Sequence, residues 1–119
     1  MTARLRNKFE QKIASQLKKA KIPFEYEKTR LPFTITGWYI PDYTIPGPIF
    51  LEVKGYLRPE TKRKMAGVRK NNPNADIRFI FQCRENTKQG RSYGRWAHKL
   101  GFLYCYGSVP KAWLQRFVG

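Results

Sequence analysis

Two carboxylates and a lysine at a fixed spacing are the residues of this sequence best suited to chemistry. Asp42 follows a proline, Glu52-Val53-Lys54 comes ten residues later, and Pro46-Gly47-Pro48 lies between them. Proline and glycine favour turns, and both flanking runs are apolar and β-prone, so the stretch predicts a β-hairpin. A hairpin symmetric about Gly47 pairs Asp42 with Glu52, and the period of two along a strand puts Lys54 on that same face. The remaining pairs are Tyr43 with Leu51, Thr44 with Phe50 and Ile45 with Ile49, while Ile49, Leu51 and Val53 face a core.

Two acids directly opposite each other need a compensating charge. Like charges across a strand pair repel, and Lys54 can balance only one of the two carboxylates. A divalent cation such as Mg²⁺ would supply the rest, because hard cations bind carboxylate oxygens and keep waters and substrate phosphates as further ligands. The alternative is an exposed strand end with an ordinary Glu52–Lys54 ion pair. We favour a metal site.

The charge balance indicates the partner. The chain has 119 residues, which we expect to form one domain over residues 1–119, with 24 Lys and Arg against 8 Asp and Glu and a formal net charge of +16. A chain this basic favours nucleic acid, with an anionic membrane surface as the alternative. No apolar run is long enough for a membrane span or signal peptide, so we expect a soluble, cytoplasmic protein. Cys83 and Cys105 lack metal-ligand spacing and are interpreted as buried thiols in a reducing compartment.

A third acid lies in the first predicted helix, residues 4–21. Leu5, Phe9, Ile13 and Leu17 recur every four residues and form its apolar stripe. Glu10 flanks that stripe in a helix otherwise charged by lysines and arginines. Glu10 could form a helical charge pair with a neighbour such as Arg6; with the hairpin acids, it is predicted to be a third metal-site carboxylate.

The rest of the chain predicts a mixed α/β sandwich. Strands are expected at 24–28, with Glu25 and Glu27 solvated, and at 77–81 and 102–106, with extended segments at 31–35 and 38–40. Helices are expected at 59–71, at 92–100 after a polar loop at 85–90, and from residue 110. The second helix is strongly cationic, and we expect it and the first helix to contact DNA phosphates through Lys62, Arg63, Lys64, Arg69, Lys70 and Lys12.

Several other conspicuous side chains are predicted to be structural. His98 is alone on its helix, so packing or solvent exposure is expected. Trp38, Trp96 and Trp113 are expected in the core, and Tyr93 is likewise interpreted as a core residue.

These motifs resemble a known family. Pro41-Asp42 followed by Glu52-Val53-Lys54 matches the signature of the restriction-endonuclease-like (PD-(D/E)xK) nuclease superfamily. Within it, the chain resembles the bacteriophage endonuclease I family of Holliday-junction resolvases. The likeness runs from about Phe9 to Leu114 and includes the segments 9–10, 22–27, 40–43, 49–55, 76–78, 92–94 and 109–113.

The resemblance implies a restriction-endonuclease-like mixed sheet flanked by helices, and a homodimer with exchanged segments. It implies Glu10, Asp42, Glu52 and Lys54 as the active site, with Glu10 supplied by the other chain. Two Mg²⁺ ions, replaceable by Mn²⁺, would be held by Asp42, Glu52, the Val53 carbonyl and Glu10, with no small-molecule cofactor. The substrate would be branched double-stranded DNA inside an infected bacterial cell. In one departure, the connection at 31–40, which would bridge exchanged halves, is shorter than expected.

Two other functions fit the same residues. One is a different nuclease of this fold, such as a mismatch-nicking, transposition-associated or restriction enzyme. The other is a non-catalytic basic nucleic-acid-binding protein, which would bind without metal and cleave nothing.

Overall fold

The computed structural model describes residues 7–32 and 37–114, so Leu5 and Arg6 lie outside the described residues. The elements along the chain are α1 (Lys8–Lys19), β1 (Glu25–Tyr26), β2 (Leu31–Pro32), β3 (Trp38–Tyr39), β4 (Tyr43–Ile45), β5 (Ile49–Lys54), α2 (Pro59–Asn71), β6 (Asp76–Phe81), α3 (Lys88–Lys99), β7 (Leu103–Tyr106) and α4 (Lys111–Leu114). The predicted order of helices and strands, and the mixed α/β class, are confirmed.

The main sheet has five strands in the order β1-β4-β5-β6-β7. β1, β4 and β5 pair antiparallel, whereas β5, β6 and β7 pair parallel. The predicted hairpin register is confirmed for three pairs, since Tyr43 pairs with Leu51, Thr44 with Phe50 and Ile45 with Ile49. The fourth predicted pair, Asp42 with Glu52, lies beyond the end of this ladder, because β4 begins at Tyr43. β2 and β3 form a separate two-stranded ribbon. In the main sheet the central strand is β5, which carries Glu52 and Lys54.

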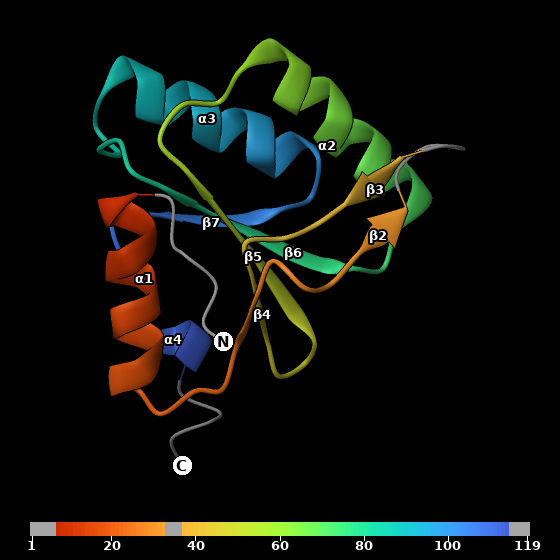
Figure 1. Ribbon diagram of the computed structural model, residues 1–119. Helices are drawn as coiled ribbons and strands as arrows, with labels where there is room; N and C mark the ends of the chain where they lie inside the picture. The colour runs from red at the N-terminus through yellow and green to blue at the C-terminus, as the bar shows by residue number, and fades with distance from the viewer. Residues whose placement is uncertain (1–6, 33–36, 115–119) are drawn as a thin grey trace.

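Helices cover both faces of this sheet, with α2 and α3 side by side on one face and α1 and α4 on the other (Figure 1). On the α1 face, Ile13 and Leu17 pack with alternate β5 side chains, among them Leu51. On the α2 face, Met65 packs with a second cluster that includes Phe79. The α1 face of β5 is apolar, whereas the other face carries Phe50, Glu52 and Lys54. The predicted core positions Ile49, Leu51 and Val53 are confirmed.

Capping residues correct two predicted helix starts. α1 begins at Lys8, not Arg4, because Asn7 has an extended backbone and its side chain accepts the Glu10 N–H. α3 begins at Lys88, not Ser92, because the Thr87 hydroxyl accepts the Gly90 N–H. The predicted loop at 85–90 is therefore wrong for its last three residues.

Local burial corrects two further expectations. Trp38 is 52% exposed, and its ring lies under the Arg30 guanidinium, 5.3 Å from the ring centroid, so it is not a core residue. Cys83 is only half-buried, whereas Cys105 is buried and its burial raises the thiol pKa to about 12. His98 is exposed and Tyr93 buried, as expected. Within the described residues, none of the helices combines the length and apolarity that crossing a bilayer requires.

Candidate active site

Asp42 lies immediately before β4, where the hairpin brings it against the C-terminal end of β5. Its side chain is 3% exposed, and its Oδ2 accepts the backbone N–H of Val53 at 2.7 Å. The backbone N–H of Glu27, just after β1, donates to the Asp42 carbonyl at 3.0 Å. The antiparallel pairing on both sides therefore fixes the position of this carboxylate.

Glu52 and Lys54 lie near Asp42 around one hollow of about 160 Å³, to which Tyr39, Thr61 and Lys64 also contribute. Glu52 is 5% exposed. Its Oε1 accepts the Tyr39 hydroxyl at 2.7 Å, and its Oε2 lies 3.0 Å from the Lys54 ammonium. Two buried carboxylates and two lysines thus share a single polar hollow beside α2.

Burial and the neighbouring charges shift the pKa of Asp42. Burial raises the pKa of Asp42 to about 8, and the charge of Glu52 raises it further than that of Glu10. The Val53 N–H and the Lys54 ammonium act in the opposite direction. Burial, followed by the Glu52 charge, likewise raises the pKa of the Tyr39 hydroxyl. Without a bound cation, the Asp42 carboxyl therefore keeps its proton to a much higher pH than an ordinary aspartate does.

Glu10 joins this site from α1. Its side chain is 2% exposed, so it is not a surface charge on a solvated helix face. The Tyr26 hydroxyl donates to Glu10 Oε1 at 3.2 Å, and the Tyr43 hydroxyl donates to its backbone carbonyl at 2.7 Å. Both tyrosines belong to the same chain, so within one chain α1 already places Glu10 beside Asp42.

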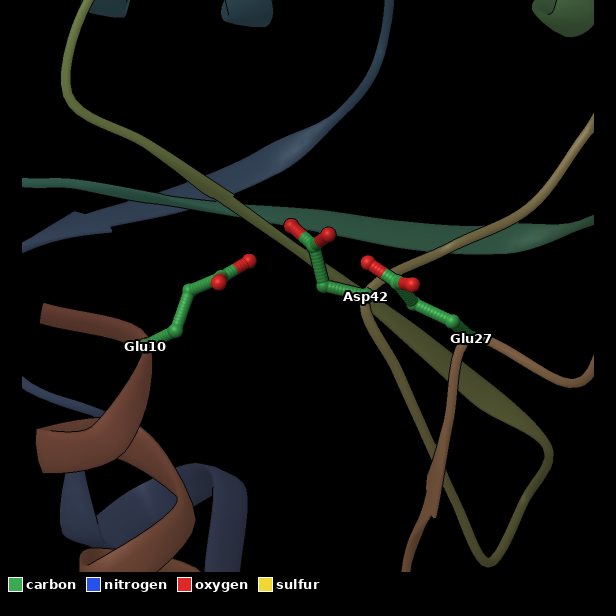
Figure 2. Close-up of side chains that lie close together, drawn as sticks. All are labelled: Glu10, Glu27 and Asp42. Atoms are coloured by element: carbon green, nitrogen blue, oxygen red, sulfur yellow. The ribbon is translucent and has the colours of Figure 1, made fainter. Parts of the chain in front are cut away.

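Glu27 is the residue that sequence reasoning missed. Carboxylate oxygens of Glu10, Glu27 and Asp42 lie within 4.8 Å of one another, and the three side chains point toward a common centre (Figure 2). Strand alternation had placed Glu27 on the solvated face with Glu25. It is exposed, but its φ of 52° breaks the alternation after Tyr26 and turns the carboxylate toward Asp42. In the structure Glu27 lies one step past the Tyr26–Tyr43 pair, a pairing that was not predicted from the sequence.

These acids suit a hard cation. The donors are carboxylate oxygens at a spacing that a shared ion could bridge, they are mostly buried, and their charge exceeds that of Lys54. Asp42 belongs to two groups of acids. It lines the hollow together with Glu52, and its carboxylate also lies close to those of Glu10 and Glu27. The donor set therefore fits Mg²⁺ or Mn²⁺, with the Val53 carbonyl remaining a predicted ligand.

The predicted phosphate-binding cations divide into two groups. Lys64 lines the hollow, Lys62 lies on α2 one residue from Thr61, and Lys12, Arg63 and Lys70 are exposed on the two helices. Arg69 forms the second group, because its guanidinium is engaged within the fold, and we no longer expect it to contact phosphate. Its guanidinium donates to backbone carbonyls around the C-terminal ends of α2 and α3, and it lies 4.5 Å from the Phe102 ring centroid.

Comparison with known proteins identifies the family of this chain. The family model described as phage endonuclease I matches residues 1–118. Endodeoxyribonuclease 1 of enterobacteria phage T3 is 34% identical over 117 residues, which cover 93% of this chain and 77% of the relative. Endonuclease I of Escherichia phage T7 is 32% identical over 117 residues, which cover 93% of this chain and 78% of the relative. The chain therefore belongs to the phage endonuclease I family.

Proposed function

We propose that this protein is a metal-dependent DNA endonuclease that resolves four-way (Holliday) and other branched junctions. One observation carries the proposal: a chain of net charge +16 gathers four of its eight acids, Glu10, Glu27, Asp42 and Glu52, around one site. A protein that only binds DNA gains nothing from carboxylates facing phosphate. The relatives named as endonucleases support the same function.

Asp42 would be the shared metal ligand, with Glu52 on one side of it and Glu10 on the other. Glu27 joins Glu10 and Asp42 as an additional candidate ligand. When bound, two Mg²⁺ ions would stabilise the attacking and leaving oxygens of phosphodiester hydrolysis. The residues themselves exclude water from the buried side and hold the carboxylates in place, through Tyr39 on Glu52, Tyr26 on Glu10 and the Val53 N–H on Asp42.

Lys54 is the candidate catalytic cation. Its ammonium is 3.0 Å from Glu52 Oε2, and its side chain is 27% exposed, so it is held in place yet accessible from the hollow. In this position it would orient the attacking water and offset charge that develops on the phosphate oxygens. Lys64 of α2, which lines the same hollow, would contact the same phosphate or its neighbour.

Binding would depend on charge and DNA shape. The cations of α1 and α2 would neutralise backbone phosphates, a contact that carries no sequence information. A junction presents a backbone geometry without a fixed sequence, so recognition by shape fits the substrate. As a phage nuclease, the protein would act on DNA inside the infected bacterial cell.

The protein would act as a homodimer so that two sites cut two strands of a junction. The contacts that α1 makes within one chain would also form between chains if the segments before and after residues 31–40 were exchanged, because exchange of an identical element preserves its contacts. We propose such an exchanged dimer for this protein.

The direct experiment compares cleavage of a four-way junction, a mismatched duplex and a linear duplex, with Mg²⁺, with Mn²⁺ and with EDTA. We expect metal-dependent cleavage with a preference for the junction of at least 100-fold. Asp42→Asn, Glu52→Gln, Lys54→Ala and Glu10→Ala should abolish cleavage while the folded protein still binds the junction. Preferential cleavage of the mismatch would indicate a different nuclease of this fold, and metal-independent binding without cleavage would indicate a non-catalytic DNA-binding protein.

A further inference from the structure

A second groove lies on the other side of the first turns of α2 from the catalytic hollow. Its volume is about 560 Å³, and its walls include Tyr56, Pro59 and Lys62 on one side and Lys88, Ser92 and Tyr93 on the other. Thr61 and Lys64 of the same helix line the catalytic hollow. The first turns of α2 thus form a wall shared by the two depressions.

Tyr56 is the unusual residue of this groove. It follows the catalytic strand by two residues and is 62% exposed, the most exposed large hydrophobic side chain of the described residues. The Arg58 guanidinium lies 5.7 Å from its ring centroid. An aromatic ring that contributes little to the core, and that carries a cation beside it, suits stacking against a nucleobase.

The backbone beside Tyr56 is held by α3. The N–H of Leu57 donates to the Tyr93 hydroxyl at 2.9 Å, and the Gln89 side-chain amide donates to the same hydroxyl at 2.9 Å. Tyr93 is buried and packs on Phe81, 5.3 Å between ring centroids. These contacts attach the loop that carries Tyr56 to the core. The backbone that bears the Tyr56 ring is therefore held in place.

The groove differs in charge from the catalytic hollow. Among the described residues, the groove is lined by two lysines, Lys62 and Lys88, and by no carboxylate, whereas the lysines of the hollow, Lys54 and Lys64, are matched by Asp42 and Glu52. Cations around an accessible aromatic ring match a DNA strand, whose backbone is anionic and whose bases have π faces.

We propose that this groove binds the DNA strand next to the scissile phosphate, with Tyr56 stacked on a nucleotide that is unstacked at the branch point. Lys62 and Lys88 contact the phosphates beside that nucleotide. Bases within a continuous duplex are stacked on both sides and offer no free face, whereas a branch point interrupts the stack. Tyr56 is therefore a residue that selects branched over linear DNA, an inference that rests on the proposed function.

The test measures binding by fluorescence anisotropy in EDTA, with a four-way junction and a linear duplex of equal length. Tyr56→Ala should weaken junction binding by about 5- to 100-fold and duplex binding by less than about twofold, and Tyr56→Phe should retain the wild-type preference. Leu103→Ala, which removes another exposed apolar side chain, is the matched control. Equal loss on the two DNAs, or no loss beyond that of Leu103→Ala, overturns the stacking role.

The lysines are tested through the salt dependence of the affinity. Lys62→Ala/Lys88→Ala should lower the slope of log affinity against log salt by about 1.8, because each phosphate contact contributes about 0.9. Lys99→Ala/Lys111→Ala removes two exposed lysines outside the groove and outside α1 and α2, and should change the slope by less. Equal slopes for the two double variants overturn the phosphate contacts. A wild-type protein that fails to cleave junctions with metal would instead refute the proposed function.

Discussion

The hydroxyl of Tyr39 donates a hydrogen bond to Oε1 of Glu52 at 2.7 Å, and both residues are buried. Lys54 contacts the other oxygen of the same carboxylate at 3.0 Å. Both oxygens of Glu52 are therefore oriented before any substrate binds. Because Tyr39 comes from β3 and Glu52 from β5, the small β2–β3 ribbon contributes directly to the geometry of the site.

Tyr39→Phe should impair catalysis without impairing DNA binding. Loss of the hydroxyl removes the hydrogen bond to Oε1 of Glu52 and keeps the contact of Oε2 with Lys54. Removing an interaction that orients a metal ligand typically costs about 10- to 100-fold in metal affinity or activity. The measurements are the metal concentration for half-maximal cleavage and the junction affinity in EDTA. The control is Tyr106→Phe, whose hydroxyl bonds the Gly90 carbonyl away from the site. Equal effects of the two variants would contradict a positioning role.

Glu27→Gln should weaken metal binding although Glu27 is exposed. Its carboxylate lies with those of Glu10 and Asp42, so neutralising it removes one candidate donor and one negative charge. We expect about 10-fold weaker Mn²⁺ binding by calorimetry and a matching rise in the metal concentration that cleavage requires. Glu85→Gln neutralises another exposed acid, one outside the cluster, and should bind Mn²⁺ like the wild type. Wild-type affinity in Glu27→Gln would remove this residue from the site.

The metal-free protein should lose stability as pH rises through neutrality. Burial raises the pKa of Asp42 from 3.8 to about 8, so the folded state holds a proton that the unfolded state releases near pH 4. The stabilisation from this group is complete below about pH 4 and is lost as pH rises to about 8. Asp42→Asn should therefore be more stable than the wild type at pH 8 in EDTA, by about 1–3 kcal/mol, and the difference should shrink at pH 5.

Urea unfolding at pH 5, 6.5 and 8 measures this difference directly. Adding Mg²⁺ should stabilise the wild type at pH 8 and have little effect on Asp42→Asn, because the bound ion would offset the charge that the proton otherwise neutralises. A stability difference that is the same at all three pH values would show that the Asp42 carboxyl does not titrate in this range.

The hairpin was predictable because its information is local. Pro46-Gly47-Pro48 marks the turn, and a hairpin centred on Gly47 fixes which side chains pair, so the register followed from the sequence. The period of two along each strand then fixes which face each side chain occupies. Glu27 could not be placed in this way. Its positive φ interrupts strand periodicity, and its proximity to Glu10 depends on how α1 packs against the sheet.

The role of Arg69 was also beyond local reasoning. Next to Lys70 in a cationic helix, Arg69 has the same sequence signature as a phosphate-binding residue. Its carbonyl partners Ala75, Leu100 and Gly101 come from two other segments that meet the end of α2 only in the folded chain. The sequence shows that Arg69 is positively charged, but it does not show which groups the guanidinium contacts.

Arg69→Ala should therefore destabilise the fold and leave DNA affinity nearly unchanged. The guanidinium bonds several carbonyls at once and stacks on Phe102, and burial lowers its pKa. We expect a loss of about 1–3 kcal/mol in unfolding free energy, with little rescue by Arg69→Lys because an ammonium cannot reproduce the planar fork. Lys70→Ala is the control and should preserve stability. A drop in junction affinity without a drop in stability would return Arg69 to the DNA-binding set.

Exchange of segments between chains has a decisive test, because Glu10 and Asp42 lie on opposite sides of the connection at residues 31–40. Glu10→Ala and Asp42→Asn should each be inactive alone. The two variants are unfolded together and refolded to form mixed dimers. In an exchanged dimer, one site of each mixed dimer combines the intact Glu10 of one chain with the intact Asp42 of the other, so nicking of one junction strand should return.

If each site is instead completed within one chain, every site of the mixed dimer lacks one of the two acids and the mixture stays inactive. Refolded wild type checks that the procedure restores activity, and a mixture of Asp42→Asn with Glu52→Gln serves as the negative control. Those two residues lie in the same segment, so neither arrangement yields an intact site. The outcome therefore distinguishes the two ways in which the same α1 contacts can form, within one chain or between two.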